Sequence, residues 1–135
     1  MDPLPHTVTE FVERAPVCRI ATVRPDGEPH VIPVCPVFDG ETLYVDVGDR
    51  SATASGVRDS GRVSVLIDEY DDDWSKLRAV VLKCRARELS GEEKDAVWDR
   101  IREKFPQHSS VNWEPRLTLA LEVQDWREWG LTGAG

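Results

Sequence analysis

Two tight-turn signals divide the first third of this 135-residue sequence into short segments of strand character. Residues 24–27 (Arg-Pro-Asp-Gly) combine a proline that fixes φ with a glycine that tolerates positive φ, and residues 39–40 (Asp-Gly) form a second turn signal. Segments rich in apolar residues flank these turns at 17–23, 30–38 and 42–47. Because short turns join antiparallel neighbours, we predict that the first two segments form a hairpin and that the third is a strand.

Three further strands are predicted in the rest of the chain. Residues 62–68 (RVSVLID) and 116–123 (RLTLALEV) alternate in the manner of strands, and a longer strand is expected from about residue 77 to residue 89. The segment 48–61 is small and polar, so we expect a loop there that carries at most a short helix. Most consecutive strands are joined tightly, which favours antiparallel pairing and a β-barrel over a βαβ fold.

Two helices are predicted from capping-box signals. Residues 7–10 (Thr-Val-Thr-Glu) and 90–93 (Ser-Gly-Glu-Glu) each place a hydroxyl three residues before a glutamate, and each precedes apolar residues at helical spacing. Pro16 ends the first helix, and Pro106 closes the second.

Composition limits the partners of the chain. The length predicts a single domain over residues 1–135, ordered over about 7–131 and followed by a flexible tail. A formal net charge of −8 argues against nucleic acid and against an anionic membrane surface. No apolar run approaches the roughly 20 residues that cross a bilayer, and the first residues lack the basic and apolar regions of a secretory signal. A cytoplasmic location is therefore expected.

The chemistry-bearing residues form no recognisable catalytic or metal motif. Cys18, Cys35 and Cys84 lie far apart among apolar residues, and we predict buried free thiols. The three histidines are scattered, and the acidic residues 71–73 lack the ligand spacing of a calcium loop, so no metal site is expected. No glycine-rich phosphate fingerprint is present.

The order and spacing of several segments resemble one family. Residues 20–34 (IATVRPDGEPHVIPV), followed by 39–44 (DGETLY) and 62–68 (RVSVLID), are similar to the opening strands of the pyridoxamine 5′-phosphate oxidase-like family, the FMN-binding split barrels. Residues 70–75 (YDDDWS) resemble one branch of it, the probable deazaflavin-dependent enzymes. The resemblance covers about residues 7–131.

This resemblance implies a mainly β fold, an antiparallel Greek-key split β-barrel with two or three helices. It also implies a homodimer whose two barrels enclose two cofactor sites at their interface. The cofactor would be FMN or a deazaflavin coenzyme, and the reaction a hydride transfer between the cofactor ring and a small-molecule substrate.

Site residues follow from the resemblance by position. Backbone groups of the second strand typically line the ring, and polar residues after the third strand typically meet the cofactor phosphate. The ring candidates here are Ile32, Pro33, Val34 and Cys35; the phosphate candidates are Asp46, Arg50, Ser51, Thr53 and Arg58. Trp74 could reach a ring from the neighbouring subunit.

The predicted phosphate segment departs from the family pattern. Thr53 and Gly56 stand where family members usually have Lys and Asn, so Arg50 and Arg58 are the basic residues that remain nearby. Two alternatives to an oxidoreductase stay open: a flavin- or deazaflavin-binding module without turnover, and a dimeric barrel that has lost its cofactor.

Overall fold

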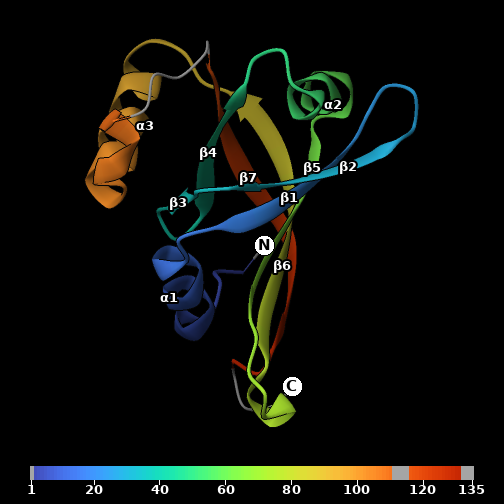
Figure 1. Ribbon diagram of the computed structural model, residues 1–135, viewed down its shortest axis with the longest axis vertical. Coiled ribbons are helices and arrows are strands. Elements are labelled where there is room, and N and C mark those ends of the chain that lie inside the picture. Colours follow the sequence, from blue (N-terminus) through green and yellow to red (C-terminus); the bar gives the residue numbers. More distant parts are fainter. Residues whose placement is uncertain (1, 111–115, 132–135) are drawn as a thin grey trace.

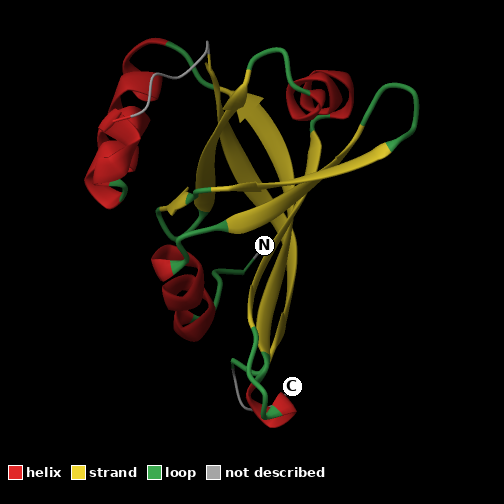
Figure 2. Ribbon diagram, viewed as in Figure 1, coloured by secondary structure: helices red, strands yellow, loops and turns green. Residues whose placement is uncertain are grey.

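The computed structural model describes residues 2–110 and 116–131, and its centre is a strongly curled antiparallel sheet (Figure 1). The seven strands follow the order β2-β1-β5-β6-β7-β4-β3 and form a half-barrel. This confirms the predicted mainly β split barrel, and three α-helices pack against the sheet (Figure 2). The elements are α1 (His6–Arg14), β1 (Cys18–Val23), β2 (Pro29–Val34), β3 (Val37–Phe38), β4 (Thr42–Gly48), α2 (Ala52–Ser60), β5 (Arg62–Glu69), β6 (Arg78–Glu88), α3 (Gly91–Lys104) and β7 (Arg116–Trp129), with short 3₁₀ turns η1 (Trp74–Lys76) and η2 (Pro106–Ser110).

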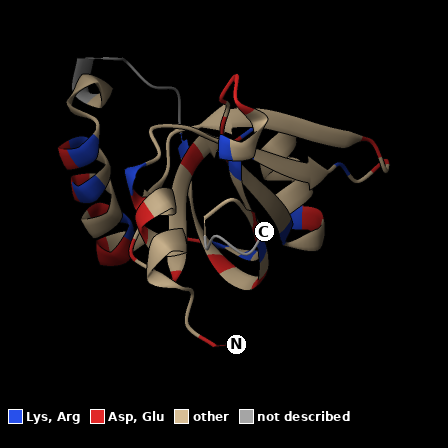
Figure 3. Cartoon of the chain, turned by 90° about the horizontal axis from the view of Figure 1, so that it is seen from below, with Lys and Arg blue, Asp and Glu red and all other residues tan. Residues whose placement is uncertain are grey.

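Two hydrophobic clusters hold the helices to the sheet. Alternate residues of the strands meet inside the curl, where Phe11 of α1 and Val57 of α2 join them. The second cluster lies outside the curl, where Ile101 and Phe105 pack with Ala120 of β7. Because β7 is covered on both faces, residues 117–121 are buried without a break. Residues of both charge signs alternate along α3, with Glu92 and Glu93 in its first turn and Arg102 and Lys104 in its last (Figure 3).

Both predicted capping boxes are wrong, although both helices are present. The first helix begins at His6 with Pro5 as its N-cap residue, so Thr7 lies within the helix and cannot cap it. At the second helix Ser90 is the N-cap residue but makes no side-chain capping bond. Glu93 instead accepts two hydrogen bonds from Arg87 at 2.8 and 3.1 Å, so it is not free to cap the helix.

Three predicted boundaries change in the structure. The return strand predicted at 30–38 is divided into β2 and β3 at Pro36, which has no N–H to donate to a strand ladder. The segment predicted as a loop at 48–61 holds α2, nine residues long. The last strand continues to Trp129 instead of ending near residue 123.

The predicted flexible tail beyond residue 131 lies outside the described residues. No helix in the described part of the chain is long and apolar enough to span a membrane.

Candidate functional site

The predicted ring-lining residues lie on β2, which forms one edge of the sheet. β1 is its only strand neighbour in the described part of the chain. Ile32 packs against the core, while Pro33, Val34 and Cys35 line a cavity of about 400 Å³ that reaches Ile101 of α3 and Phe105 just after it. One side of β2 therefore keeps its backbone groups open to a ligand.

The cysteines differ in their surroundings. Cys18 and Cys84 are buried free thiols as predicted, and burial raises the pKa of each to about 12. Cys35 is exposed, so the prediction of a buried thiol is wrong there. It follows the last residue of β2 and precedes Pro36, where the chain leaves the sheet.

Asp46 lies under α3, away from the other phosphate candidates. Its Oδ1 accepts a hydrogen bond from the Thr118 hydroxyl at 2.6 Å, and that hydroxyl accepts one from Trp98 Nε1 at 2.8 Å. Asp46 Oδ2 lies 3.7 Å from His108 Nε2, and Arg116 donates to the Asp46 backbone oxygen. Burial raises the pKa of the Asp46 carboxyl. This chain of contacts joins β4, β7 and α3.

A shallow recess at the start of α2 gathers two of the phosphate candidates, Arg50 and Ser51. Arg24, from the turn between β1 and β2, lines the same recess and was not predicted; its Nε lies 3.8 Å from Asp26 Oδ1. Ser51 is also the N-cap of α2, because its hydroxyl accepts from the Ala54 N–H at 3.1 Å. We call these residues the Arg24–Arg50 recess.

Thr53 and Arg58 have other surroundings. The Thr53 side chain is fully buried, on the side of α2 that faces the sheet. Arg58 donates from Nη1 to the Asp49 backbone oxygen at 2.6 Å, which holds the loop before α2. The sequence had no signal for this burial, since it depends on how closely α2 approaches β1.

That approach is close at Gly56. A Cβ atom there would lie 2.8 Å from the Val23 carbonyl oxygen and 3.1 Å from Thr22 Cβ. The family position usually filled by Asn is thus occupied by the residue that lets α2 rest on β1.

Trp74 lies far from the other candidates of the same chain. It begins η1 at the tip of the hairpin β5–β6, whereas α2 lies at the opposite end of the sheet (Figure 1). Its side chain is 73% exposed, and its Nε1 donates to the Tyr70 hydroxyl at 3.3 Å. A contact from this tip to a ring in a neighbouring subunit stays a prediction.

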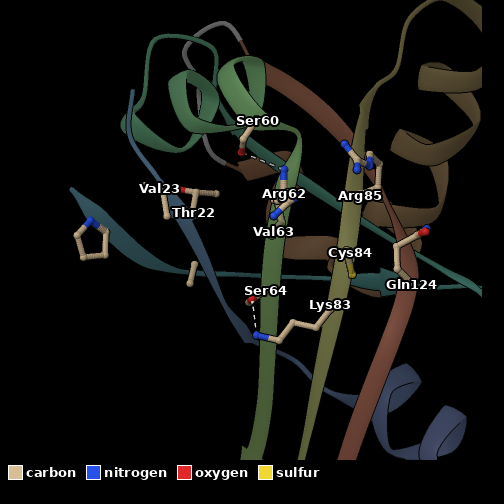
Figure 4. Close-up of a pocket in the computed structure, with 12 residues that line it drawn as sticks. Thr22, Val23, Ser60, Arg62, Val63, Ser64, Lys83, Cys84, Arg85 and Gln124 are labelled. Carbon is tan, nitrogen blue, oxygen red and sulfur yellow. Dashed lines mark hydrogen bonds between the residues drawn. The ribbon is translucent and has the colours of Figure 1, made fainter. Parts of the chain in front are cut away.

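A cationic cavity that sequence reasoning missed lies at the other end of α2. Its volume is about 690 Å³, and Arg62, Lys83 and Arg85 line it (Figure 4). The three residues are scattered in the sequence, and only the register of β5 with β6 brings them together.

Known proteins support the fold and the family. The sequence model of the pyridoxamine 5′-phosphate oxidase family matches residues 4–130. No curated protein matches. Among solved structures, a heme binding protein from Mycobacterium smegmatis is similar with a TM-score of 0.79 and 20% identity over 96% of this chain and 56% of that one. An FAD-binding protein from Mesorhizobium loti has a TM-score of 0.75 and 20% identity, covering 94% of this chain and 93% of that one. An F420 reductase has a TM-score of 0.71 and 18% identity, covering 92% and 98%.

At these identities the solved structures establish the fold, and the family match covers nearly the whole chain. The described strands also begin and end close to the segments that carried the resemblance. The chain belongs to the pyridoxamine 5′-phosphate oxidase family.

Proposed function

We propose that this protein binds a flavin or deazaflavin coenzyme along β2 and works as an oxidoreductase that transfers a hydride between the coenzyme ring and a small molecule. The observation that carries the proposal is the open edge of β2, which follows directly from the turn that holds Arg24. Family membership and the FAD-binding and F420-related structural neighbours support it.

The residues at β2 suit the two ends of such a coenzyme. Pro33 and Val34 offer apolar surface to a flat ring, and the open strand edge offers backbone hydrogen-bonding groups. Arg24, Arg50 and Ser55 line the Arg24–Arg50 recess, and two arginines and a hydroxyl suit a phosphate. The Ser51 hydroxyl, which also lines it, already donates to the Gly48 carbonyl oxygen at 2.7 Å. Asp26 offsets part of the positive charge, because it lies beside Arg24.

The chemistry would come from the coenzyme, whose ring accepts or donates the hydride. The protein's part is to hold and orient it. Arg50 would fix the phosphate end, and the backbone of β2 would fix the ring against the sheet. Ile32, which is half-buried against the core, would anchor the inner side of the strand.

We also propose that the protein is a homodimer. Three large apolar side chains on neighbouring strands stay open on the outer face of the sheet: Val23 is 51% exposed, Val31 63% and Leu66 38%. A second copy would cover this face and could bring its Trp74 to the coenzyme. Sedimentation at micromolar concentration tests this: a mass near 30 kDa, twice the 15.2 kDa of the chain, supports the dimer, and a monomer mass contradicts it.

Coenzyme binding can be measured by quenching of tryptophan fluorescence. Protein stripped of bound ligand is titrated with FMN and, separately, with the deazaflavin coenzyme F420. We expect micromolar binding of one of them, and Arg50→Ala should weaken it at least tenfold, about 1.4 kcal/mol. The matched control is Arg102→Ala, which removes an exposed arginine on α3. Equal affinity in the two variants would contradict the phosphate assignment, and no binding up to millimolar concentration would contradict the function.

A further inference from the structure

The outer face of the sheet carries opposite charges at its two ends. At the α2 end, Arg62 and Arg85 stand directly opposite each other in the register of β5 and β6, and Lys83 lies two residues along the same face (Figure 4). These three residues line the cationic cavity, and no acidic residue is among its described lining. Like charges directly opposite each other destabilise a strand pair, so an acidic partner would stabilise this end of the face.

The sheet itself does not supply that partner. Glu122 is opposite Arg85, but its Oε1 lies 3.7 Å from Arg87 Nε. Asp125 is opposite Lys83, but its carboxylate accepts a hydrogen bond from the next backbone N–H along the chain and forms no ion pair with Lys83. Among the described residues, the positive charge of the cavity therefore stays unbalanced.

The opposite end of the same face is acidic. Residues 70–74 (Tyr-Asp-Asp-Asp-Trp), here called the acidic tip, follow β5 and lie far from α2 (Figure 1). Tyr70 and Trp74 are 71% and 73% exposed. Asp72 is exposed as well, and its carboxylate has no hydrogen bond or ion pair within the described part of the chain. Exposed aromatic side chains grouped with charge of one sign suit a contact with a basic partner surface.

Leu66 lies midway between the two ends and is itself exposed. Arg62 precedes it by four positions along β5, and Tyr70 follows it by four. At about 3.3 Å per residue, each end of the face is about 13 Å from Leu66. A two-fold axis through the face at Leu66 would therefore place the acidic tip of one copy over the cationic cavity of the other, and both contacts would form at once.

The same axis would also bring two exposed apolar side chains together. Val31 on β2 is level with Ser64, two positions before Leu66. Trp129 on β7 is level with Asp68, two positions after Leu66. β2 and β7 are each two strands away from β5, on opposite sides. A half-turn about Leu66 thus places Trp129 of one copy over Val31 of the other, and burying these side chains would add apolar area to the charged contacts.

We propose that two copies of this chain pack through the outer faces of their sheets about a two-fold axis near Leu66, with the acidic tip of each in the cationic cavity of the other. The tip carboxylates would remove the repulsion between Arg62 and Arg85 and accept charge-assisted hydrogen bonds from them. The cavity, about 690 Å³ in volume with Val23 and Pro29 in its wall, is the size of a small-molecule site and can hold an aromatic side chain.

This arrangement rests on the homodimer of the proposed function and adds how the two subunits meet. The Arg24–Arg50 recess shares no described lining residue with the cavity, so the contact does not use the residues assigned to the coenzyme phosphate. Coenzyme binding and dimerisation can therefore be measured separately.

Charge reversal on each side of the contact tests the proposal. Arg62→Glu/Arg85→Glu makes the cavity acidic, and Asp71→Lys/Asp72→Lys makes the tip basic. Sedimentation gives the dissociation constant of the dimer for each variant alone and for their equimolar mixture. We expect each variant alone to dimerise at least tenfold more weakly than the wild type, because tip and cavity then repel each other. In the mixture every contact again joins opposite charges, so heterodimers should form with close to wild-type affinity.

The matched control is Asp95→Lys/Glu103→Lys, which reverses two exposed carboxylates of α3 and should leave the dimer unchanged. Circular dichroism checks that each variant is folded, and the neutral variant Arg85→Gln should weaken the dimer by a smaller factor. Three results would overturn the proposal: wild-type affinity in either reversed variant, an equal loss in the control, or no recovery in the mixture. A monomeric wild type would contradict the homodimer itself, whereas unchanged FMN binding in Arg50→Ala with an intact dimer would concern the coenzyme site alone.

Discussion

The two ends of α2 carry two cationic regions that differ in how their charge is balanced. At its start, the Arg24–Arg50 recess has two arginines, and one of them lies beside Asp26. Just beyond its end, the cationic cavity has three basic side chains and no acidic lining residue among those described. The region where the family pattern predicts a phosphate is thus the weaker of the two. The excess of basic over acidic side chains, more than similarity to the family pattern, indicates which region favours binding of an anion.

The largest loss of stability and of binding should follow from a substitution that forces α2 away from the sheet, since both cationic regions adjoin this helix. Gly56→Val places side-chain atoms where a Cβ already lies 2.8 Å from the Val23 carbonyl oxygen. We expect the free energy of unfolding to fall by about 2 kcal/mol, with weaker coenzyme binding at the recess and weaker dimerisation at the cationic cavity. Urea denaturation measures this. Gly48→Ala is the control, because its Cβ would meet only Ser51 Cβ at an ordinary 3.8 Å; equal stability of the two variants would show that α2 does not need the close approach.

A substitution in the polar contacts beneath α3 should lower the free energy of unfolding by no more than Gly56→Val does. It should leave coenzyme binding and dimerisation, which involve the two cationic regions, unchanged. Thr118→Val keeps the shape but removes the hydroxyl that joins Trp98 Nε1 to Asp46 Oδ1. Buried polar groups would lose their partners, which costs about 2 kcal/mol. Thr42→Val on β4, half-exposed at the other end of the strand, is the control. If Thr118→Val also changed the dissociation constant of the dimer, the cavity would not be independent of α3.

The smallest effect tests the charge balance itself. At protein concentrations low enough for the monomer, Arg85→Gln should raise the free energy of unfolding by about 0.5 kcal/mol at low salt, because it removes one of two opposed like charges. Arg87→Gln, on the same strand face, should lower stability instead, since Arg87 pairs with Glu93 and lies near Glu122. Thermal unfolding at low and high salt measures both. A loss of stability in both variants would show that the Arg85 charge is already balanced.

Local patterns predicted the strands well and the details of the site poorly. Alternating residues and turn signals marked the hairpin β1–β2 and the strands β5 and β6, because those signals act over a few residues. Glu93 does not cap its helix, because its carboxylate accepts hydrogen bonds from Arg87 on the preceding strand. The burial of Thr53 depends on the packing of α2 against β1.

The cationic cavity depends on strand register, which no short sequence pattern contains. Arg62 and Arg85 are 23 positions apart and meet only because β5 and β6 pair in one particular register. A shift by one residue would move Arg85 to the other face. For the same reason no sequence pattern predicted that Arg24 and Arg50 line one recess, since a turn and a helix start meet there only in the folded chain.

The most direct test is to observe the arginine side chains themselves by NMR. The Nε–Hε signals of Arg24, Arg50, Arg62 and Arg85 are followed while FMN, or F420 if that is the coenzyme bound, is added to saturation, and they are then compared with those of Asp71→Lys/Asp72→Lys. The coenzyme should shift Arg24 and Arg50, and the tip substitutions should shift Arg62 and Arg85. Shifts of Arg62 and Arg85 on adding the coenzyme, with Arg24 and Arg50 unchanged, would contradict the account, because the cationic cavity would then be the coenzyme's own phosphate site.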